Sequence, residues 1–437
     1  KFIIDNDEYV NNDAYVTMYT NREINIKIEK TDTSSTINFA KIKWELEGKV
    51  VSAKAKAPEI LVFNVNKTNL PNDKNELLVL DSLGKCLIKL KIKTYTAPVV
   101  KFDESEKFNG EYFFDHGFEF SSLASKTYYD TIKVGKNKDV YYAPVLGLNK
   151  DQTVNIRVNI SDFASLAQQD KNFKIVFKPK IQGIIKINNS DSLVLDATGL
   201  NNLKEITIEA KDYINRKTIT AMPIFVYISS TGEKVGLIEY YCAKKEAKQV
   251  KLIYIQFKDE RNFPSYLAPA SLNTFLDNNS MQQLFLDLNV DSVHFKSKKL
   301  KLTDVNTLTN EQILDSLNLE KFGRKQPLGF SSVFDYFYIT NLQKHDAQAN
   351  TYLGGFHWVG DQGGVQVKYQ VSSLGESAEE QTTHEFGHWI GFPHTWKKNG
   401  FINVVIEPNQ AGTKDNFMDY NIKRKKFLKI QLLHYRR

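Results

Sequence analysis

Near the C-terminal end of this 437-residue sequence, two histidines stand four residues apart, in the run His384-Glu385-Phe386-Gly387-His388. On a helix this spacing puts both imidazoles on one face, where they can reach one metal ion. Glu385 would then lie beside the ion, placed to hydrogen-bond a water molecule rather than to bind the metal. Ser377 and Glu380 have the Ser-x-x-Glu form of a capping box, so we expect a helix over about residues 378 to 390.

Gly391 and His394 extend the pattern to His-Glu-x-x-His-x-x-Gly-x-x-His. Glycine tolerates the left-handed conformation that ends a helix, so Gly391 is expected to turn the chain and return His394 to the metal. Three protein ligands leave the fourth coordination position open to water, which is typical of catalytic zinc sites. A metal-free helix with two buried histidines would leave Glu385 and His394 unexplained. The sequence therefore predicts a zinc site with His384, His388 and His394 as ligands.

A second feature follows the histidines, the run Asn416-Phe417-Met418-Asp419-Tyr420, in a chain with only 4 methionines. The long histidine motif followed by a methionine-containing turn resembles the metzincin clan of zinc metallopeptidases. Within that clan, Thr395, Trp389 and the Met-Asp-Tyr sequence resemble the pappalysin-like family. The motifs that carry the resemblance lie between residues 380 and 422.

The resemblance implies a role for each of these residues. His384, His388 and His394 would bind one zinc ion, and Glu385 would be the general base. Met418 would form the hydrophobic floor under the metal. Tyr420 would be a swinging fifth ligand or would donate to the tetrahedral intermediate.

The sequence departs from the pappalysin-like pattern after the third histidine. Members of that family usually have a longer segment before the Met-turn, with disulfides and calcium sites. Here the segment is short and contains no cysteine. The sequence therefore gives no support for a bound calcium ion. The two cysteines of the chain, Cys86 and Cys242, are expected to be free thiols. No flanking pattern marks Cys242 as a thiolate that would keep a zinc site latent.

The length of the chain predicts a multidomain protein, because one hydrophobic core does not serve this many residues. Residues 1–97 alternate apolar and polar side chains, as in Ile24–Ile28 and Ile88–Lys93, which predicts a β-sandwich-like domain. Ala97-Pro98 marks a boundary, and residues 98–243 repeat the alternation, most clearly in Val154–Ile160. We therefore expect two N-terminal all-β, sandwich-like domains.

One segment of the second region, Phe108–Asp115, resembles part of the β-rich N-terminal modules of bacterial type VI secretion cargo. Those modules precede a C-terminal toxic domain. An ordinary aromatic-rich strand and turn explains the same residues equally well.

Residues 244–437 change in character and predict an α+β domain like the catalytic domain of metzincins. Val250–Phe257 and Val333–Ile339 are continuous apolar runs that suit buried strands. Helical spacing covers Ala270–Leu288, and Thr309 with Gln312 forms a capping box that opens a helix through about Leu319.

Two further elements are expected in this last region. An edge hairpin within residues 354–371, turning at Asp361–Gly364, is expected to border the cleft and to pair with an extended substrate. Phe427–Tyr435 has the spacing of a short amphipathic helix that closes the domain.

The sequence predicts a secreted or exported bacterial zinc endopeptidase acting on a protein or peptide, although no signal segment is visible. Secretion machinery and an immunity or inhibitor protein are the partners that this export route implies. Neither a membrane span nor a nucleic-acid partner is expected, because no long apolar run occurs and the net charge of +7 is spread along the chain. Two other functions stay open. The first is a zinc-hydrolase effector that acts on cell-wall peptides or other non-protein amides, and the second is a β-domain binding protein whose zinc domain is inactive.

Overall fold

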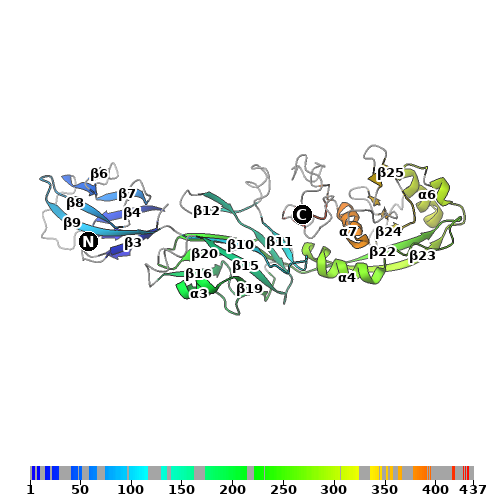
Figure 1. Cartoon of the computed structure of the whole chain (residues 1–437), viewed down its shortest axis with the longest axis horizontal. Helices are drawn as coiled ribbons and strands as arrows, with labels where there is room; N and C mark the ends of the chain where they lie inside the picture. Colours follow the sequence, from blue (N-terminus) through cyan, green and yellow to red (C-terminus); the bar gives the residue numbers. More distant parts are fainter. Residues whose placement is uncertain are drawn as a thin grey trace.

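The computed structural model shows a chain made mostly of β-sheet, with several sandwich-like pairs of sheets (Figure 1). It describes residues 2–4, 7–9, 15–19, 22–28, 41–47, 49–51, 59–65, 74–95, 98–116, 129–134, 139–161, 173–213, 221–230, 232–305, 307–323, 335–343, 345–346, 351–352, 355–357, 363–366, 377–390, 392, 394, 416–418, 427, 429, 431 and 432. No helix in these ranges is long and apolar enough to cross a bilayer.

The first β-rich region consists of two sheets that share one core. One sheet has the order β2-β1-β4-β7, with the strands β1 (Phe2–Ile4), β2 (Asp7–Tyr9), β4 (Arg22–Ile28) and β7 (Ile60–Val65). The other has the order β3-β9-β8-β5-β6, with the strands β3 (Tyr15–Tyr19), β5 (Lys43–Leu46), β6 (Lys49–Val51), β8 (Lys74–Leu80) and β9 (Cys86–Tyr95). Ile26 and Leu61 of the first sheet pack in one buried cluster with Trp44 and Leu77 of the second. The predicted sandwich-like arrangement is thus present here.

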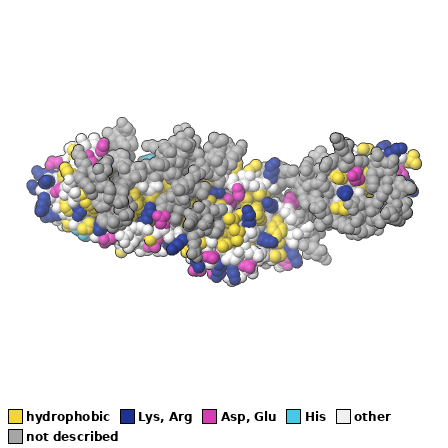
Figure 2. Space-filling view, turned by 180° about the vertical axis from the view of Figure 1, so that it is seen from behind, with side chains coloured by type: hydrophobic (Ala, Val, Ile, Leu, Met, Phe, Trp, Pro, Cys, Tyr) yellow, Lys and Arg dark blue, Asp and Glu magenta, His cyan; other side chains and the backbone are white. Residues whose placement is uncertain are grey.

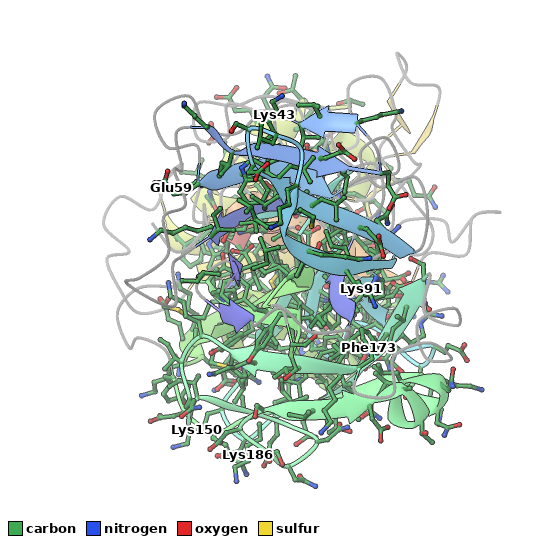
Figure 3. All side chains as sticks on the ribbon, turned by 90° about the vertical axis from the view of Figure 1, so that its left-hand side faces the viewer. Lys43, Glu59, Lys91, Lys150, Phe173 and Lys186 are labelled. Carbon is green, nitrogen blue, oxygen red and sulfur yellow. The ribbon has the colours of Figure 1, made fainter. Side chains whose placement is uncertain are left out.

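The second β-rich region repeats this architecture with one four-stranded and one six-stranded sheet. Its four-stranded sheet has the order β10-β15-β19-β17, with β10 (Val99–Glu104), β15 (Thr153–Ser161), β17 (Ile185–Ile187) and β19 (Glu205–Ala210). Its six-stranded sheet has the order β11-β14-β21-β20-β16-β18, with β11 (Phe113–Asp115), β14 (Val145–Leu148), β16 (Lys174–Pro179), β18 (Leu193–Asp196), β20 (Met222–Ile228) and β21 (Lys234–Cys242). A short helix, α3 (Ala197–Asn202), follows β18, and β12 (Thr131–Val134) pairs with β13 (Asp139–Tyr142). Lys150 and Lys186 lie at the outer rim of this region (Figure 3).

The last part of the chain contains a five-stranded sheet with the order β23-β22-β24-β28-β27. The strands β22 (Glu246–Gln256), β23 (Leu286–Lys296), β24 (Asp335–Ile339) and β28 (Gly363–Gln366) are parallel, and the edge strand β27 (Gly355–His357) is antiparallel to β28. Two short strands, β25 (His345–Asp346) and β26 (Thr351–Tyr352), form a separate pair.

Helices cover both faces of this sheet. The first crossover, through α4 (Pro269–Asn279) and the 3-10 turn η2 (Met281–Leu284), leads from β22 to β23. The second, through α5 (Leu302–Val305) and α6 (Asn310–Phe322), leads across β22 to β24 on its other side. Right-handed crossovers in opposite directions put their helices on opposite faces. Leu252 of β22 accordingly packs with α4 and with α7 (Ala378–Trp389), while Ile253 packs with α6.

Several predicted elements are confirmed. The capping box of Thr309 and Gln312 opens α6, which runs one residue short of Gly323 because that glycine ends it in the left-handed conformation. The strands predicted at 250–257 and 333–339 are β22 and β24. Cys86 and Cys242 are both free thiols.

Two predicted boundaries were wrong. The helix expected over Ala270–Leu288 ends at Asn279, because Ser280 leaves the helical conformation. The 3-10 turn η2 that follows ends at Phe285 in a left-handed conformation, and the edge strand β23 begins at Leu286 with alternating burial. In the edge hairpin, Gly363 and Gly364 open β28 rather than forming the turn. Of the helix expected over Phe427–Tyr435, the structure describes four residues, and three of them are helical: Lys429, Gln431 and Leu432.

The second and last regions share a hydrophobic core. In β11, Phe114 faces the sandwich core while its neighbour Phe113 packs with Phe285 and Phe427 of the last region. The predicted domain boundaries after residues 97 and 243 stay predictions, and the second of them crosses this shared core.

A buried ion pair joins the same two regions. Lys429 Nζ lies 2.5 Å from Glu239 Oε2, and these side chains are only 6% and 4% exposed. Burial raises the pKa of Glu239, and the neighbouring Lys429 charge opposes that rise.

We expect Lys429→Met to lower the free energy of unfolding by about 3–5 kcal/mol, because it leaves the Glu239 carboxylate buried without its partner. Replacing both residues, in Lys429→Met/Glu239→Met, should recover much of that loss. Lys89→Met is a matched control, since Lys89 Nζ lies 2.5 Å from Glu76 Oε1 but these side chains are 38% and 46% exposed. It should change stability by at most about 1 kcal/mol. Urea unfolding measures all three, and equal losses in the two single variants would contradict the burial argument.

Candidate metal centre

The helix α7 carries the histidine motif and begins where the sequence predicts. Ser377 Oγ accepts a hydrogen bond from Glu380 N at 3.1 Å, and Glu380 Oε2 accepts one from Ser377 N at 2.9 Å, so the capping box is complete. The acidic residues of the first turn also complement the helix dipole. Glu379 Oε1 accepts from Ser271 Oγ of α4 at 2.6 Å. The helix is thereby fixed at its start, and its residues from Gln381 to Trp389 are all buried.

The structure brings the three predicted histidines together. His394 Nε2 lies 3.2 Å from His384 Nε2 and 3.2 Å from His388 Nε2. Of the described residues, these three form one of two groups that could hold a metal ion. His394 returns to the helix as predicted, whereas Gly391 and Thr395 lie outside the described residues.

Hydrogen bonds to the backbone fix which nitrogen of each helix histidine carries its proton. His384 Nδ1 lies 2.7 Å from the carbonyl oxygen of Phe417, and His388 Nδ1 lies 2.7 Å from that of Phe392. A carbonyl oxygen can only accept, so each Nδ1 donates, and in a neutral ring Nε2 is left as a lone pair. The two lone pairs both face His394 Nε2. A proton on His394 Nε2 could make a hydrogen bond to one of these lone pairs. A cation could interact with the lone pairs of all three nitrogens at once.

Glu385 is a buried residue of the helix α7. It follows His384 on α7, its side chain is buried, and its Oε2 oxygen is shielded from solvent. A carboxylate that follows the first histidine on a buried helix suits a cationic centre, because a nearby positive charge favours the ionised form.

Met418 lies directly against the helix that carries the histidines. It is fully buried, and a Cβ atom added to Gly387 would lie 2.1 Å from its sulfur. The helix and the Met-turn can approach this closely only because residue 387 has no side chain. The turn itself is held by Asn416 Oδ1, which accepts from Met418 N at 2.8 Å. Tyr420 lies outside the described residues.

Sequence reasoning missed the residues that orient His384 and His388. The accepting carbonyls of Phe392 and Phe417 leave no side-chain pattern, and neither does the pairing of Asn416 with Gln431 at 2.9 Å. The sequence shows only that Phe392 and Phe417 are apolar, which predicts that they are buried. Both are core residues.

The second group that could hold a metal consists of Asp103, Glu104 and His116. Arg157 Nη2 donates to Asp103 Oδ2 at 2.8 Å, and His116 Nε2 lies 2.6 Å from Asp103 Oδ1. Although burial opposes it, the His116 hydrogen bond and the nearby positive charges hold the pKa of Asp103 far below its ordinary value. A guanidinium already fills the cationic role here, so this cluster is best described as an ion-pair network.

Cys242 is not part of the histidine group that could hold a metal ion. It is buried in the core of the second β-rich region, and burial raises the pKa of its thiol to about 12. A thiol that stays protonated is a poor metal ligand.

The edge hairpin lies beside the helix of the metal centre, since α7 packs against β27 and β28. Because β27 is the last strand of its sheet, one side of it has no strand partner among the described residues. The hairpin thus adjoins the histidine-bearing helix, and its predicted pairing with an extended substrate stays a prediction.

Comparisons with known proteins add little. No family model matches the chain, and no curated protein matches its sequence. Among solved structures, fibronectin(III)-like modules of CbhA from Clostridium thermocellum are similar at a TM-score of 0.23 and 11% identity, over 55% of this chain and 93% of that one. BcpA, the major pilin subunit of Bacillus cereus, is similar at 0.18 and 9%, over 48% and 67%. Likenesses at these TM-scores carry no argument about function.

Gly387→Ala should disturb both the helix and the Met-turn, because the new methyl group overlaps the buried Met418 sulfur. We expect a loss of about 1–3 kcal/mol in the free energy of unfolding, as for other overpacked cores. Met418→Ala in the same chain makes room for the new methyl group. The double variant should therefore lose less free energy of unfolding than the two single variants lose together. Strictly additive losses in thermal or urea unfolding would show that the two residues do not press on each other.

Proposed function

We propose that this chain is a zinc-dependent endopeptidase of the metzincin type, most like the pappalysin-like family. One observation carries the proposal. The Nε2 atoms of His384 and His388 both lie 3.2 Å from His394 Nε2, and Glu385 follows the first of these ligands. Three imidazole ligands, with a carboxylate next to them in the sequence that does not bind the metal, are typical of a catalytic rather than a structural zinc site.

The spacing of the three nitrogens fits zinc. Around a tetrahedral zinc ion bound at about 2.0–2.1 Å, two imidazole nitrogens lie about 3.3–3.4 Å apart. The distances of 3.2 Å from His394 Nε2 to His384 Nε2 and to His388 Nε2 agree with that figure. The second condition for a zinc histidine, a backbone or carboxylate partner on its other ring nitrogen, is met by His384 and His388.

The sheet topology supports a peptide substrate. Strand β27 is antiparallel to its neighbour, lies at the edge of the sheet and packs beside α7. An extended peptide can add to such an edge through main-chain hydrogen bonds, which brings its backbone toward the metal centre. This arrangement favours an α+β catalytic domain for the last region of the chain.

A bound zinc ion would supply Lewis-acid chemistry, acidifying water and polarising the scissile carbonyl group. Glu385 accepts the proton from the attacking water as the C–O bond forms, then delivers it to the leaving amine as the C–N bond breaks. His384 and His388 keep their orientation through the Phe417 and Phe392 carbonyls. Met418, packed against Gly387, holds the floor of the centre.

The proposed substrate is a protein or peptide, and the proposed setting is a bacterial secreted or exported protein. Export implies secretion machinery and an immunity or inhibitor protein as partners. Basic and acidic side chains are interspersed on the face shown in Figure 2, which favours a protein rather than a nucleic acid as the ligand.

Glu385→Ala should keep zinc bound and abolish turnover, because it removes the proton acceptor without removing a ligand. Casein cleavage and metal content, measured on the same preparations, check both parts. Glu311→Ala is the matched control, since Glu311 is exposed on the first turn of α6, on the other face of the sheet, and should leave cleavage largely intact.

Near-native peptidase activity in Glu385→Ala would contradict the proposed mechanism. Running cell-wall peptide fragments beside casein tests the substrate class. Cleavage of the fragments alone would replace the endopeptidase with a cell-wall amidohydrolase that uses the same residues.

Tyr420→Phe should lower kcat on the order of 10- to 1000-fold with zinc retained, as for the loss of one donor to a developing oxyanion. Steady-state kinetics on a peptide that the wild type cleaves measures this change in kcat. An unchanged kcat would remove Tyr420 from the proposed site.

A further inference from the structure

The two carbonyl groups that orient the ligand histidines belong to residues whose rings meet on one side chain. The ring centroid of Phe427 lies 4.9 Å from that of Phe417 and 5.7 Å from that of Phe392. The carbonyl of Phe417 accepts from His384, and that of Phe392 accepts from His388. All three phenylalanines are fully buried. The ring of Phe427 therefore packs against both residues whose carbonyl groups orient the histidines.

Phe427 is itself held from the second β-rich region. Its backbone N donates to Gln283 Oε1 at 3.0 Å, and Gln283 Nε2 donates to the carbonyl oxygen of Gly110 at 3.0 Å. Asn279 Nδ2 likewise donates to the carbonyl oxygen of Asn109 at 3.2 Å. The segment Phe108–Asp115, which the metal site does not use, is thus a docking element for the end of the chain.

The residues after Phe427 repeat this pattern. Lys429 N donates to Asp115 Oδ2 at 2.7 Å, and Lys429 Nζ is paired with Glu239. Gln431 then exchanges hydrogen bonds with Asn416, which caps the Met-turn. Contacts with the β-rich region and contacts with the metal centre thus alternate along a stretch of five residues.

We propose that Phe427, Lys429 and Gln431 form a C-terminal brace that positions the orienting carbonyls of the metal centre against the β-rich region. This inference rests on the proposed zinc site and extends it. Phe427 is a positioning residue, acting on the ligands through Phe392 and Phe417. Residues 98–243 are a structural part of the zinc centre rather than a removable leader, because removing them would strip Lys429 of its buried partner.

The expected effect follows from how ligand orientation enters metal affinity. Partners that hold a ligating histidine in place commonly account for 10- to 100-fold in affinity. Replacing the Phe427 ring with a smaller side chain frees the Phe392 and Phe417 segments to shift. Each shift relaxes a hydrogen bond to a ligand Nδ1, so zinc should be held less tightly even with all three histidines intact.

The test is the zinc affinity of the full chain, measured by competition with a chromophoric chelator. Phe427→Leu should bind zinc about 10- to 100-fold more weakly than the wild type. Phe257→Leu is the matched control, since Phe257 is equally buried but lies in the core on the α6 face of the sheet. It should lower stability to urea while leaving zinc affinity unchanged.

Gln283→Met gives the same comparison with little change in side-chain volume, should Phe427→Leu not fold. It removes the links to Phe427 N and to the Gly110 carbonyl, so it too should weaken zinc binding. A wild type that binds no zinc would overturn the proposed function and the brace with it. A wild type that binds one zinc ion, with Phe427→Leu and Gln283→Met equally tight, would overturn the brace alone.

Discussion

Two backbone carbonyl oxygens, those of Phe392 and Phe417, accept hydrogen bonds from the Nδ1 atoms of the helix histidines. Because a carbonyl can only accept, these bonds fix the tautomer and turn both Nε2 lone pairs toward His394. In neutral rings, at most one proton lies between the three nitrogens, whereas a cation interacts with all three lone pairs. The proposed chemistry therefore depends on where two main-chain groups are held, as much as on the histidines themselves.

The surrounding structure can be understood as support for those two groups. The capping box and the Ser271–Glu379 bond fix the start of α7, and Gly387 lets the Met-turn approach the middle of the helix. The end of the chain packs Phe427 against both carbonyl-bearing residues. Its other contacts reach the second β-rich region across a shared core. A site of a few residues is in this way tied, through Lys429, to Asp115, which lies 314 residues before that lysine in the chain.

The sequence predicts the local features well, because they depend on short-range physics. The capping boxes of α6 and α7 are where Ser or Thr stands three residues before Glu or Gln, and β22 lies on its apolar run. It fails at Phe285, where a left-handed residue ends the helical region and tertiary pairing makes a strand. It also misses the Lys429–Glu239 pair, since nothing local to Lys429 shows that this charge is buried against a residue 190 positions away.

X-ray absorption at the zinc edge, on the full chain loaded with one equivalent of zinc, tests the central claim most directly. Convergence of His384, His388 and His394 predicts three imidazole nitrogens at about 2.0–2.1 Å and one further light ligand. The His394→Ala chain should then show two imidazoles. A spectrum with fewer than three imidazoles in the wild type, or one unchanged by His394→Ala, would contradict the account.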